Sequence, residues 1–181
     1  MNVAFIPVRG GSKSIPLKNI KPMCGKPLVY WTVAAACGCA KIDKVYVATD
    51  SEKIRETLLE VKQQEENEAF QKLEVIGRSA ESASDTASTE FAMLEFANEH
   101  AFDHIVLIQA TSPLLTAEDL DRGFALYEEE DTDSVLSVVR QKRFNWNVAE
   151  DGTAQALNYD YFHRPRRQEF DGYCVENGAF Y

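Results

Sequence analysis

The residues best suited to chemistry lie in one basic stretch near the N-terminus, "IPVRGGSKSIPLKNIKP", which spans residues 6–22. It surrounds the pair Gly10-Gly11 with basic side chains and contains no acidic residue. Glycines let backbone N–H groups approach phosphate oxygens closely, and basic side chains neutralise phosphate charge. The stretch matches neither the GxGxxG pattern nor the GK[ST] ending of the P-loop. It therefore predicts a phosphate-binding loop of another class.

The basic charge of this first segment contrasts with the charge of the whole chain. Residues 1–42 contain no Asp or Glu, yet the 181-residue chain has a formal net charge of −10. The basic residues of the segment are Arg9, Lys13, Lys18, Lys21, Lys26 and Lys41. An acidic chain has no general affinity for nucleic acid or anionic membranes, so we expect neither as a partner. The segment predicts one local anion site, with a solvated basic surface as the simpler alternative.

Length and composition favour a single domain over residues 1–181. A chain of this length with 45% hydrophobic residues can bury a substantial core. The first residues lack the layout of a signal peptide, and the longest apolar run, residues 28–40, is too short to cross a bilayer. The four cysteines form no paired CxxC units, so we expect reduced thiols in a cytoplasmic protein. For Cys37-Gly-Cys39, packing at a helix end is favoured over metal binding.

Short apolar runs alternate with helical patterns along the chain. The runs predict buried strands at 2–8, 44–49, 73–77, 104–109 and 134–139. One helix is expected from Pro27 to about Gly38, and another follows a cap at Asp50 or Ser51, with the buried stripe Ile54, Leu58 and Val61. A third has the stripe Phe91, Leu94, Ala97 and Ala101. The fourth starts at a capping box of Thr116 and Asp119 and carries Leu120, Phe124 and Tyr127.

Strands separated by helices predict a mostly parallel sheet in a three-layer α/β/α sandwich of the Rossmann-like class. Ligands of such sheets bind beyond the carboxyl ends of the strands. The segments that follow the predicted strands are therefore expected to form one composite site: 9–19, Asp50, 78–85 and 109–115. For Asp50 a plain helix cap is favoured, and an active-site role is the second interpretation.

Seven segments in order resemble the acylneuraminate cytidylyltransferase (CMP-N-acetylneuraminic acid synthetase) family. They are "IPVRGGSKSIPLKNI", "VYVATDS", "SDTAST", "IVLIQATSPL", "DSVLSVVR", "RPRRQEFDG" and "ENGAFY". In the first motif, Val8 stands where the family usually has Ala. The Kdo cytidylyltransferases share a similar start, but "KNI", "QATSPL" and "RPRRQ…ENGAFY" favour the acylneuraminate branch. The resemblance covers essentially the whole chain and implies the nucleotide-diphospho-sugar transferase fold.

The resemblance also implies an activity. The enzyme would transfer CMP from CTP to the anomeric hydroxyl of a sialic acid, such as N-acetylneuraminate or KDN, and release pyrophosphate. A divalent cation, Mg²⁺, would bridge the phosphate oxygens. The alternatives are another acidic sugar (legionaminate, pseudaminate or Kdo) and a fragment that binds CTP or sugar without catalysis.

The family motifs assign roles to the polar residues of two loops. Residues implied to bind CTP are Arg9, Gly11, Ser12, Lys18, Asn19, Arg78, Ser84, Asp85 and Thr86. Arg9 and Lys18 are also the implied catalytic residues, because they would hold the triphosphate and stabilise the leaving pyrophosphate. For Asp85 and Thr86, capping of the next helix is an alternative that is compatible with nucleotide binding.

The sugar site is implied to draw on two distant segments. Its residues are Gln109, Thr111, Ser112, Arg164, Arg167, Gln168, Glu176 and Asn177. Arginine suits this role because its planar guanidinium pairs with the sugar's carboxylate. Competing interpretations of the arginines are a dimer-interface patch and a nuclear-targeting cluster.

A dimerisation extension is expected at about 140–172, because the family forms homodimers by passing such an extension into the neighbour's site. Aromatic and basic residues gather there, a composition enriched at interfaces. The expected anchors are Phe144, Trp146, Tyr161 and Phe162. The alternative is a lid folded over its own subunit.

Two further points concern metal ions. The resemblance places the metal-binding aspartates after "ENGAFY", beyond Tyr181, so the C-terminal part of the family domain is expected to be absent and the metal ligands are unassigned. Asp131-Thr132-Asp133 resembles the DxD motif of metal-dependent glycosyltransferases, an alternative enzyme class with a similar fold. It precedes the predicted strand 134–139, which would place it at the amino end of that strand, away from the expected site.

Overall fold

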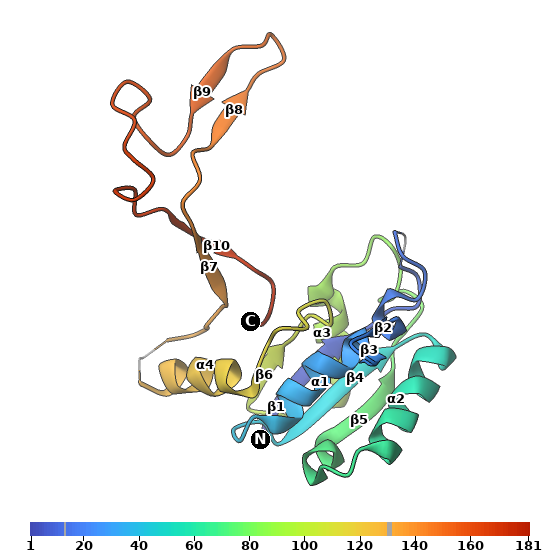
Figure 1. Cartoon of the computed structure of the whole chain (residues 1–181). Coiled ribbons are helices and arrows are strands. Elements are labelled where there is room, and N and C mark those ends of the chain that lie inside the picture. The colour runs from blue at the N-terminus through green and yellow to red at the C-terminus, as the bar shows by residue number, and fades with distance from the viewer. Residues whose placement is uncertain (13, 130–131) are drawn as a thin grey trace. The chain divides into compact units, whose positions relative to one another are not determined.

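Four parallel strands form the central sheet of the computed structural model, which describes residues 1–12, 14–129 and 132–181 (Figure 1). They are β1 (Asn2–Pro7), β4 (Lys44–Thr49), β5 (Leu73–Gly77) and β6 (His104–Leu107), in the order β5-β4-β1-β6. Phe5 on β1 lies opposite Tyr46 of β4 and Leu107 of β6. Because all four strands run in one direction, the loops that follow them leave the sheet at the same edge.

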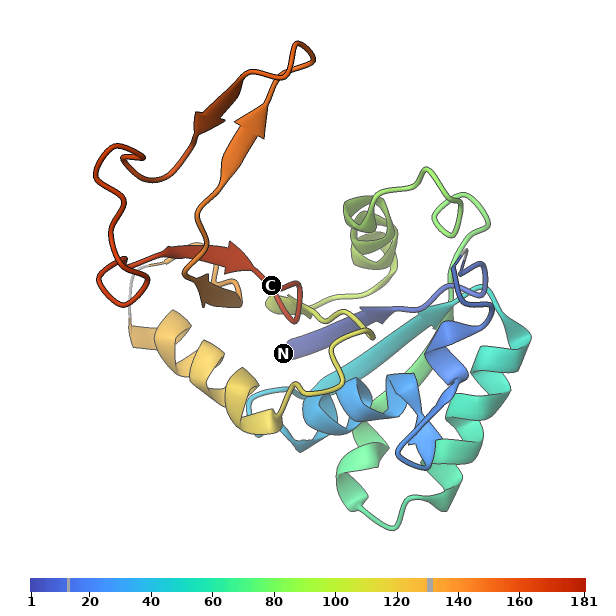
Figure 2. The same cartoon turned by 45° about the horizontal axis from the view of Figure 1, so that its top comes forward.

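Helices cover both faces of this sheet (Figure 2). The first face packs against α1 (Leu28–Gly38), α2 (Glu52–Gln64) and α4 (Ala117–Glu129), and the second against α3 (Thr89–Glu99). Alternation along β1 serves both layers, since Ala4 and Ile6 belong to the first core and Val3 and Phe5 to the second. The prediction of a three-layer α/β/α sandwich with a parallel sheet is confirmed.

The buried face of α3 differs from the predicted stripe. Phe91 and Leu94 are 38% and 58% exposed, whereas Ala92 and Phe96 are buried. Phe96 takes the inward position because its ring packs against Phe5, with ring centroids 4.9 Å apart. Ala101 lies beyond the end of the helix at Glu99. The expected start of α4 is confirmed, because Thr116 and Asp119 exchange hydrogen bonds as a capping box.

The segment between β1 and α1 contains three short elements: η1 (Lys18–Ile20), β2 (Pro22–Met23) and β3 (Lys26–Pro27). A further 3-10 helix, η2 (Glu68–Lys72), precedes β5. Near the end of α1, Cys37 and Cys39 are buried and free, so the expected helix-end packing is confirmed. Burial raises the pKa of Cys37 to about 12 and that of Cys39 to about 11.

The chain divides into two units, which we call the core unit (Met1–Ser137 and Gly178–Tyr181) and the arm unit (Val138–Asn177). The arm unit contains two antiparallel ribbons. One pairs β7 (Val138–Gln141) with β10 (Tyr173–Glu176), and the other pairs β8 (Trp146–Val148) with β9 (Ala154–Ala156).

The predicted strand at 134–139 is therefore wrong in its bounds and its pairing. The observed strand begins at Val138 and pairs antiparallel with β10. Val138 and Val139 are 44% and 43% exposed, so this apolar run belongs to a ribbon and not to a sheet covered on both faces.

No helix among the described residues is long and apolar enough to cross a membrane.

Candidate active site

Two cavities of the core unit lie at the ends of the strands and share part of their walls. The larger, of about 520 Å³, is lined by Pro7, Arg9, Ser12, Ser14, Ile15, Lys18, Asn19, Thr89, Gln109, Ala110 and Thr111. The smaller, of about 300 Å³, is lined by Pro7, Arg9, Arg78, Ser82, Ser84, Asp85, Ala87, Ser88 and Thr89. Pro7, Arg9 and Thr89 belong to both walls. The loops after β1, β5 and β6 thus meet in one composite site, as predicted.

Arg9 connects the two cavities. Its guanidinium Nη1 donates to Asp85 Oδ1 at 2.9 Å and to the Ser84 carbonyl at 3.3 Å. These contacts join the loop after β1 to the loop after β5. About a third of the Arg9 side chain remains exposed, so a ligand can reach it.

Lys18 and Asn19 reach the larger cavity because the chain turns sharply before them. Leu17 has a φ of 50°, in the left-handed region, and the Lys18 N–H donates to the Ile15 carbonyl at 3.1 Å. Asn19 is 7% exposed, which anchors this turn in the core unit. Among the described residues, no carboxylate forms an ion pair with Lys18. Its ammonium is thus a cation available to a ligand.

Gly10 ties the same loop to the end of β4. Its N–H donates to Asp50 Oδ1 at 2.9 Å. The favoured interpretation of Asp50 as a helix cap is wrong, since the N-cap residue of α2 is Ser51, whose side chain makes no capping hydrogen bond. The Asp50 carboxylate instead accepts from the glycine loop.

The loop after β5 is organised around Arg78. Its guanidinium donates to Ser82, at both the side-chain hydroxyl and the backbone carbonyl. Burial lowers the pKa of Arg78, and the nearby carboxylates of Asp50 and Glu95 oppose that shift. Ser82 is 1% exposed, so the arginine holds the loop from inside while lining the smaller cavity.

The alternative that Asp85 or Thr86 caps α3 is wrong. The N-cap residue is Ser88, whose side chain accepts from the Phe91 N–H at 3.0 Å. Asp85 is held by Arg9, and the Thr86 hydroxyl lies 3.5 Å from that of Ser84. Both residues are therefore loop residues.

Most of the predicted residues of the core unit line the composite site, but three do not. Gly11, Thr86 and Ser112 belong to the same loops and line neither cavity. Ser112 closes a turn by donating its N–H to the Gln109 carbonyl at 3.2 Å. The sequence analysis missed Ser14, Ser82, Ser88 and Thr89. The serine-rich composition of 79–89 was the available signal for the last three.

Comparison with a protein-family model identifies the family of the chain that carries this site. The family model described as "Cytidylyltransferase" matches residues 3–166, a range that contains all the loops of both cavities. The chain belongs to the cytidylyltransferase family. The matched range, residues 3–166, covers most of the 181-residue chain.

The similar proteins point to one branch of the cytidylyltransferases. The chain is 38% identical over 98% of its length to the N-acylneuraminate cytidylyltransferase A of Danio rerio, and 39% identical over 98% to the N-acylneuraminate cytidylyltransferase of Oncorhynchus mykiss. It spans about 40% of the length of each of these relatives. The resemblance to the acylneuraminate branch indicated by the motifs is confirmed.

A solved structure supports the fold of this cytidylyltransferase. CMP:2-keto-3-deoxy-manno-octonic acid synthetase, in complex with CTP, matches 99% of this chain and 72% of that chain, with a TM-score of 0.65 and 20% identity. A match at this identity shows the shared fold alone.

The remaining predicted residues, Arg164, Arg167, Gln168, Glu176 and Asn177, belong to the arm unit. Their relation to the cavities of the core unit stays a prediction. Within the arm, the Arg164 guanidinium lies over the Phe144 ring, 4.3 Å from its centroid. Phe144 also packs against Tyr159 and Phe170, so it is an internal contact of the arm's aromatic cluster.

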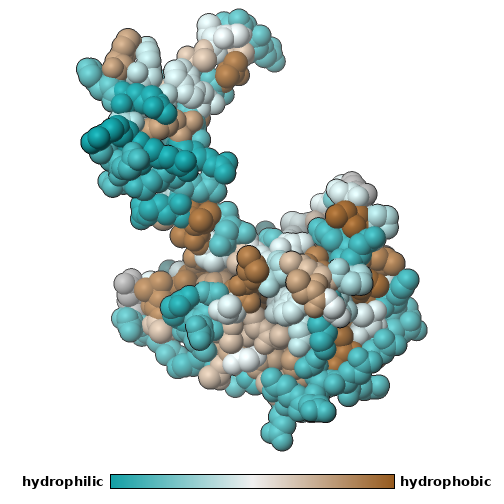
Figure 3. Space-filling model, in the orientation of Figure 1, coloured by the Kyte–Doolittle hydropathy of each residue, from teal (hydrophilic) through white to brown (hydrophobic). Residues whose placement is uncertain are grey.

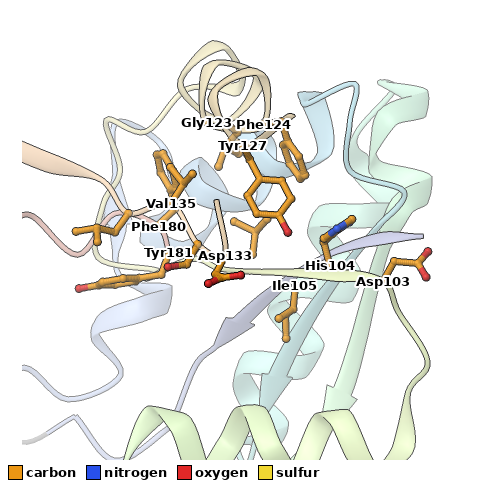
Figure 4. A pocket seen from close by; sticks show the side chains of 14 residues that line it. Asp103, His104, Ile105, Gly123, Phe124, Tyr127, Asp133, Val135, Phe180 and Tyr181 are labelled. Carbon is orange, nitrogen blue, oxygen red and sulfur yellow. The ribbon is translucent and has the colours of Figure 1, made fainter. Parts of the chain in front are cut away.

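A third cavity, of about 360 Å³, lies beside the amino end of β6, and apolar and aromatic side chains dominate its lining (Figure 4). Tyr127 of α4 points toward His104 of β6, with ring centroids 5.2 Å apart. Asp133 lines this cavity and neither of the other two, in agreement with the expectation that the DxD sequence lies away from the site. Asp131 of that sequence lies outside the described residues.

No group of three or more His, Cys, Asp or Glu side chains that could hold a metal ion occurs among the described residues. The two carboxylates nearest the glycine loop have other partners, since Asp50 accepts from Gly10 and Asp85 pairs with Arg9. These two carboxylates are therefore engaged within the loops of the site.

Proposed function

We propose that this cytidylyltransferase transfers CMP from CTP to the anomeric hydroxyl of an N-acylneuraminate and releases pyrophosphate. The observation that carries the proposal is the pair of cavities that share Arg9. The larger adds Lys18 and contains no acidic side chain, and the smaller adds Arg78 and three serines. The names of the relatives support this class of substrate, and N-acetylneuraminate is the candidate we propose first. Kdo and related acidic sugars remain alternatives within the same chemistry.

The larger cavity is the proposed triphosphate site. It contains Arg9 and Lys18 and no acidic side chain among its lining residues. Gly11 and Ser12 lie in the loop between these cations, where backbone N–H groups can approach phosphate oxygens. As the bond between the α-phosphorus and the β-phosphate oxygen breaks, negative charge grows on the leaving pyrophosphate. Cations placed there stabilise that charge, which makes Arg9 and Lys18 the proposed catalytic residues.

The smaller cavity is the proposed site of cytosine and ribose. Phosphates are common to all nucleotides, so the choice of base must be made elsewhere. Arg78 and Ser84 line this cavity, and their donors and acceptors suit the polar edge of a pyrimidine. Its volume of about 300 Å³ compares with about 520 Å³ for the larger cavity.

The acidic sugar is proposed to enter beside Gln109 and Thr111, which line the larger cavity. Its anomeric hydroxyl oxygen would attack the α-phosphorus in line with the departing pyrophosphate, and the hydroxyl proton would be released. Such a reaction depends mainly on positioning and charge stabilisation. Arg164 and Arg167 are the proposed partners of the sugar carboxylate, with Gln168, Glu176 and Asn177 contributing polar contacts.

Enzymes that transfer nucleotidyl groups in this way generally use a divalent cation, and Mg²⁺ is the ion we propose. No cluster of three or more His, Cys, Asp or Glu side chains among the described residues marks its position. We also propose a cytoplasmic location, which is supported by the four free cysteines.

We further propose a homodimer in which the arm unit forms the contact. Figure 3 shows hydrophobic patches within a largely hydrophilic arm surface. Trp146, Tyr161 and Phe162 are 45%, 53% and 76% exposed, and exposed aromatic side chains of this kind are enriched at protein interfaces. An interface role for the arm is compatible with a sugar site that both subunits share.

A pyrophosphate-release assay tests the proposed activity. Release should require CTP, N-acetylneuraminate and Mg²⁺ together, and should stop when a chelator is added. The same assay with Kdo measures the choice of sugar. Binding of CTP without turnover would support the alternative of a non-catalytic protein. A chain that binds neither CTP nor sugar would contradict the proposal.

A further inference from the structure

The glycine loop runs directly beside the chain that follows β4. Pro7 at the end of β1 lies opposite Ala48, and the Val8 N–H donates to the Ala48 carbonyl at 2.8 Å. Two residues later the loop makes its second contact with this neighbour, where the Gly10 N–H donates to Asp50 Oδ1 at 2.9 Å.

This contact determines which amide of the loop remains available. Gly10 gives its N–H to Asp50, and its carbonyl accepts the Ser12 N–H at 3.0 Å. Within residues 1–12, 14–129 and 132–181, the Gly11 N–H between them has no acceptor. A Cβ at Gly11 would meet no heavy atom within 4 Å, so nothing crowds this point of the loop. Gly11 lines neither cavity, but it precedes Ser12 of the larger one, and its N–H is free to donate to a ligand oxygen.

Ser51 fixes the same loop by contact. A Cβ built on Gly10 would lie 2.9 Å from Ser51 Cβ and 3.3 Å from Ser51 Oγ, which is too close for any side chain. Gly10 is thus required by the approach of the loop to Ser51. The hydrogen bond from Asp50 and the close approach of Ser51 together hold the glycine loop in one geometry. Both residues lie between β4 and α2.

We propose that Asp50 is a positioning residue, which holds the glycine loop in the turn that presents the Gly11 N–H to the CTP phosphates. This inference rests on the proposed function. The positioning role requires an acceptor oxygen at this position and not a negative charge, because a carboxylate beside a triphosphate would repel it. An amide oxygen at the same position can therefore replace the carboxylate.

Calorimetric titration with CTP tests this role in three variants. Asp50→Ala removes the acceptor and should weaken CTP binding by roughly ten- to a hundredfold, as expected when the Gly10 N–H is left without its partner. Asp50→Asn keeps an oxygen acceptor and should bind CTP within about threefold of the unchanged protein. A large loss of CTP affinity in Asp50→Ala with a small loss in Asp50→Asn would indicate a positioning hydrogen bond. Equal losses in both variants would indicate that the negative charge matters.

Asp43→Ala is the matched control. Asp43 Oδ2 accepts from the Asn2 N–H at 2.7 Å, so it makes the same type of bond between the same neighbouring segments at the opposite end of β1 and β4. Asp43→Ala should lower the melting temperature about as much as Asp50→Ala and leave CTP affinity unchanged. A loss of affinity in both variants would identify a structural effect and overturn the proposal.

A pair of glycine-loop variants gives an independent test. Gly10→Ala should weaken CTP binding because its Cβ displaces the loop from Ser51, and Gly10→Ala with Ser51→Gly should restore most of the affinity. Equal CTP affinity of Asp50→Ala and the unchanged protein would overturn the inference while the proposed function stands. If the unchanged protein bound no CTP, both would fail.

Discussion

The core unit and the arm unit differ in how many of their hydrophobic side chains are buried. Every buried hydrophobic residue of the described chain lies in the core unit, in two clusters on either side of the parallel sheet. The arm unit, described throughout, contributes none to that set, although it contains Trp146, Tyr161 and Phe162. Its aromatic side chains contact one another in pairs, such as Tyr161 and Phe162 with ring centroids 4.1 Å apart.

This difference suggests that the core unit is stable by itself, whereas the arm unit depends on a contact with a partner. The core unit buries large aliphatic side chains completely, which stabilises it without a partner. The arm unit has two short antiparallel ribbons, and an isolated ribbon of this kind has marginal stability in water. Its exposed aromatic surface therefore gains most from a contact with another protein surface, which is the basis of the proposed dimer.

The largest expected effect is on the core. Leu58 and Leu59 are neighbours on α2, but Leu58 is 0% exposed and Leu59 is 43% exposed. Leu58→Ala should lower the free energy of unfolding by about 2–5 kcal/mol, and Leu59→Ala by less than about 1 kcal/mol. Urea denaturation of both variants measures the difference. Similar losses would mean that α2 does not use the buried face described here.

The arm should respond to substitution in its assembly. Trp146→Ala removes an exposed aromatic anchor and should raise the dimer dissociation constant by roughly 30-fold or more, while the melting temperature of the core changes little. Analytical ultracentrifugation at micromolar concentration measures this. Gln155→Ala, an exposed polar position on β9 of the same ribbon, is the control. An unchanged protein that is a clean monomer and still binds the acidic sugar would rule out a shared site.

A third prediction divides substrate recognition between the units. Arg167→Ala should raise the KM for the acidic sugar by about tenfold or more and leave CTP binding unchanged, because its proposed partner is the sugar carboxylate. Arg143→Ala, an exposed arginine of the arm outside the motif, should change neither constant. Steady-state kinetics with each substrate varied separately measures both. A parallel loss of CTP affinity in Arg167→Ala would contradict the division.

Most of the fold of the core unit could be predicted from the sequence. Continuous apolar runs such as 44–49 indicate strands buried on both faces. Because ligands of such sheets bind beyond the carboxyl ends of the strands, the loops of the site could also be predicted. The predicted strand at 134–139 failed because an apolar run does not specify its partner, and the pairing of β7 with β10 is set by residues more than thirty positions away. The apolar periodicity of α3 also predicted Leu94 on its buried face, whereas Phe96 is the residue that is buried.

The site was harder to predict wherever a residue's partner lies on another loop. Asp50 suggested a helix cap because aspartate before a helix commonly caps it, but its acceptor oxygen is used by Gly10, forty residues earlier. Ser88 and Thr89 look like an ordinary helix start, and only the three-dimensional arrangement places Thr89 in the wall of both cavities. The arm's aromatic contacts have no sequence period that would predict them.

The smallest expected effect concerns the thiols of the two units. Cys24 in the core unit and Cys174 in the arm unit are exposed, whereas Cys37 and Cys39 are buried with raised pKa values of about 12 and about 11. At pH 8 the buried pair holds almost no thiolate, so an alkylating reagent should modify Cys24 and Cys174 only. Mass spectrometry of labelled peptides checks this. Rapid labelling of Cys37 would indicate that the end of α1 opens readily.

The central claim is that the glycine loop of the core unit binds the triphosphate of CTP, and Lys18 tests it most directly. Lys18 lines the larger cavity, whereas Lys41, the matched control, pairs with Glu128 at 2.8 Å and lines neither cavity of the site. In the pyrophosphate-release assay, Lys18→Ala should lower turnover by roughly 100- to 1000-fold, and Lys41→Ala should leave it nearly unchanged. Equal and mild effects of the two substitutions would contradict the assignment of the loop to the phosphates.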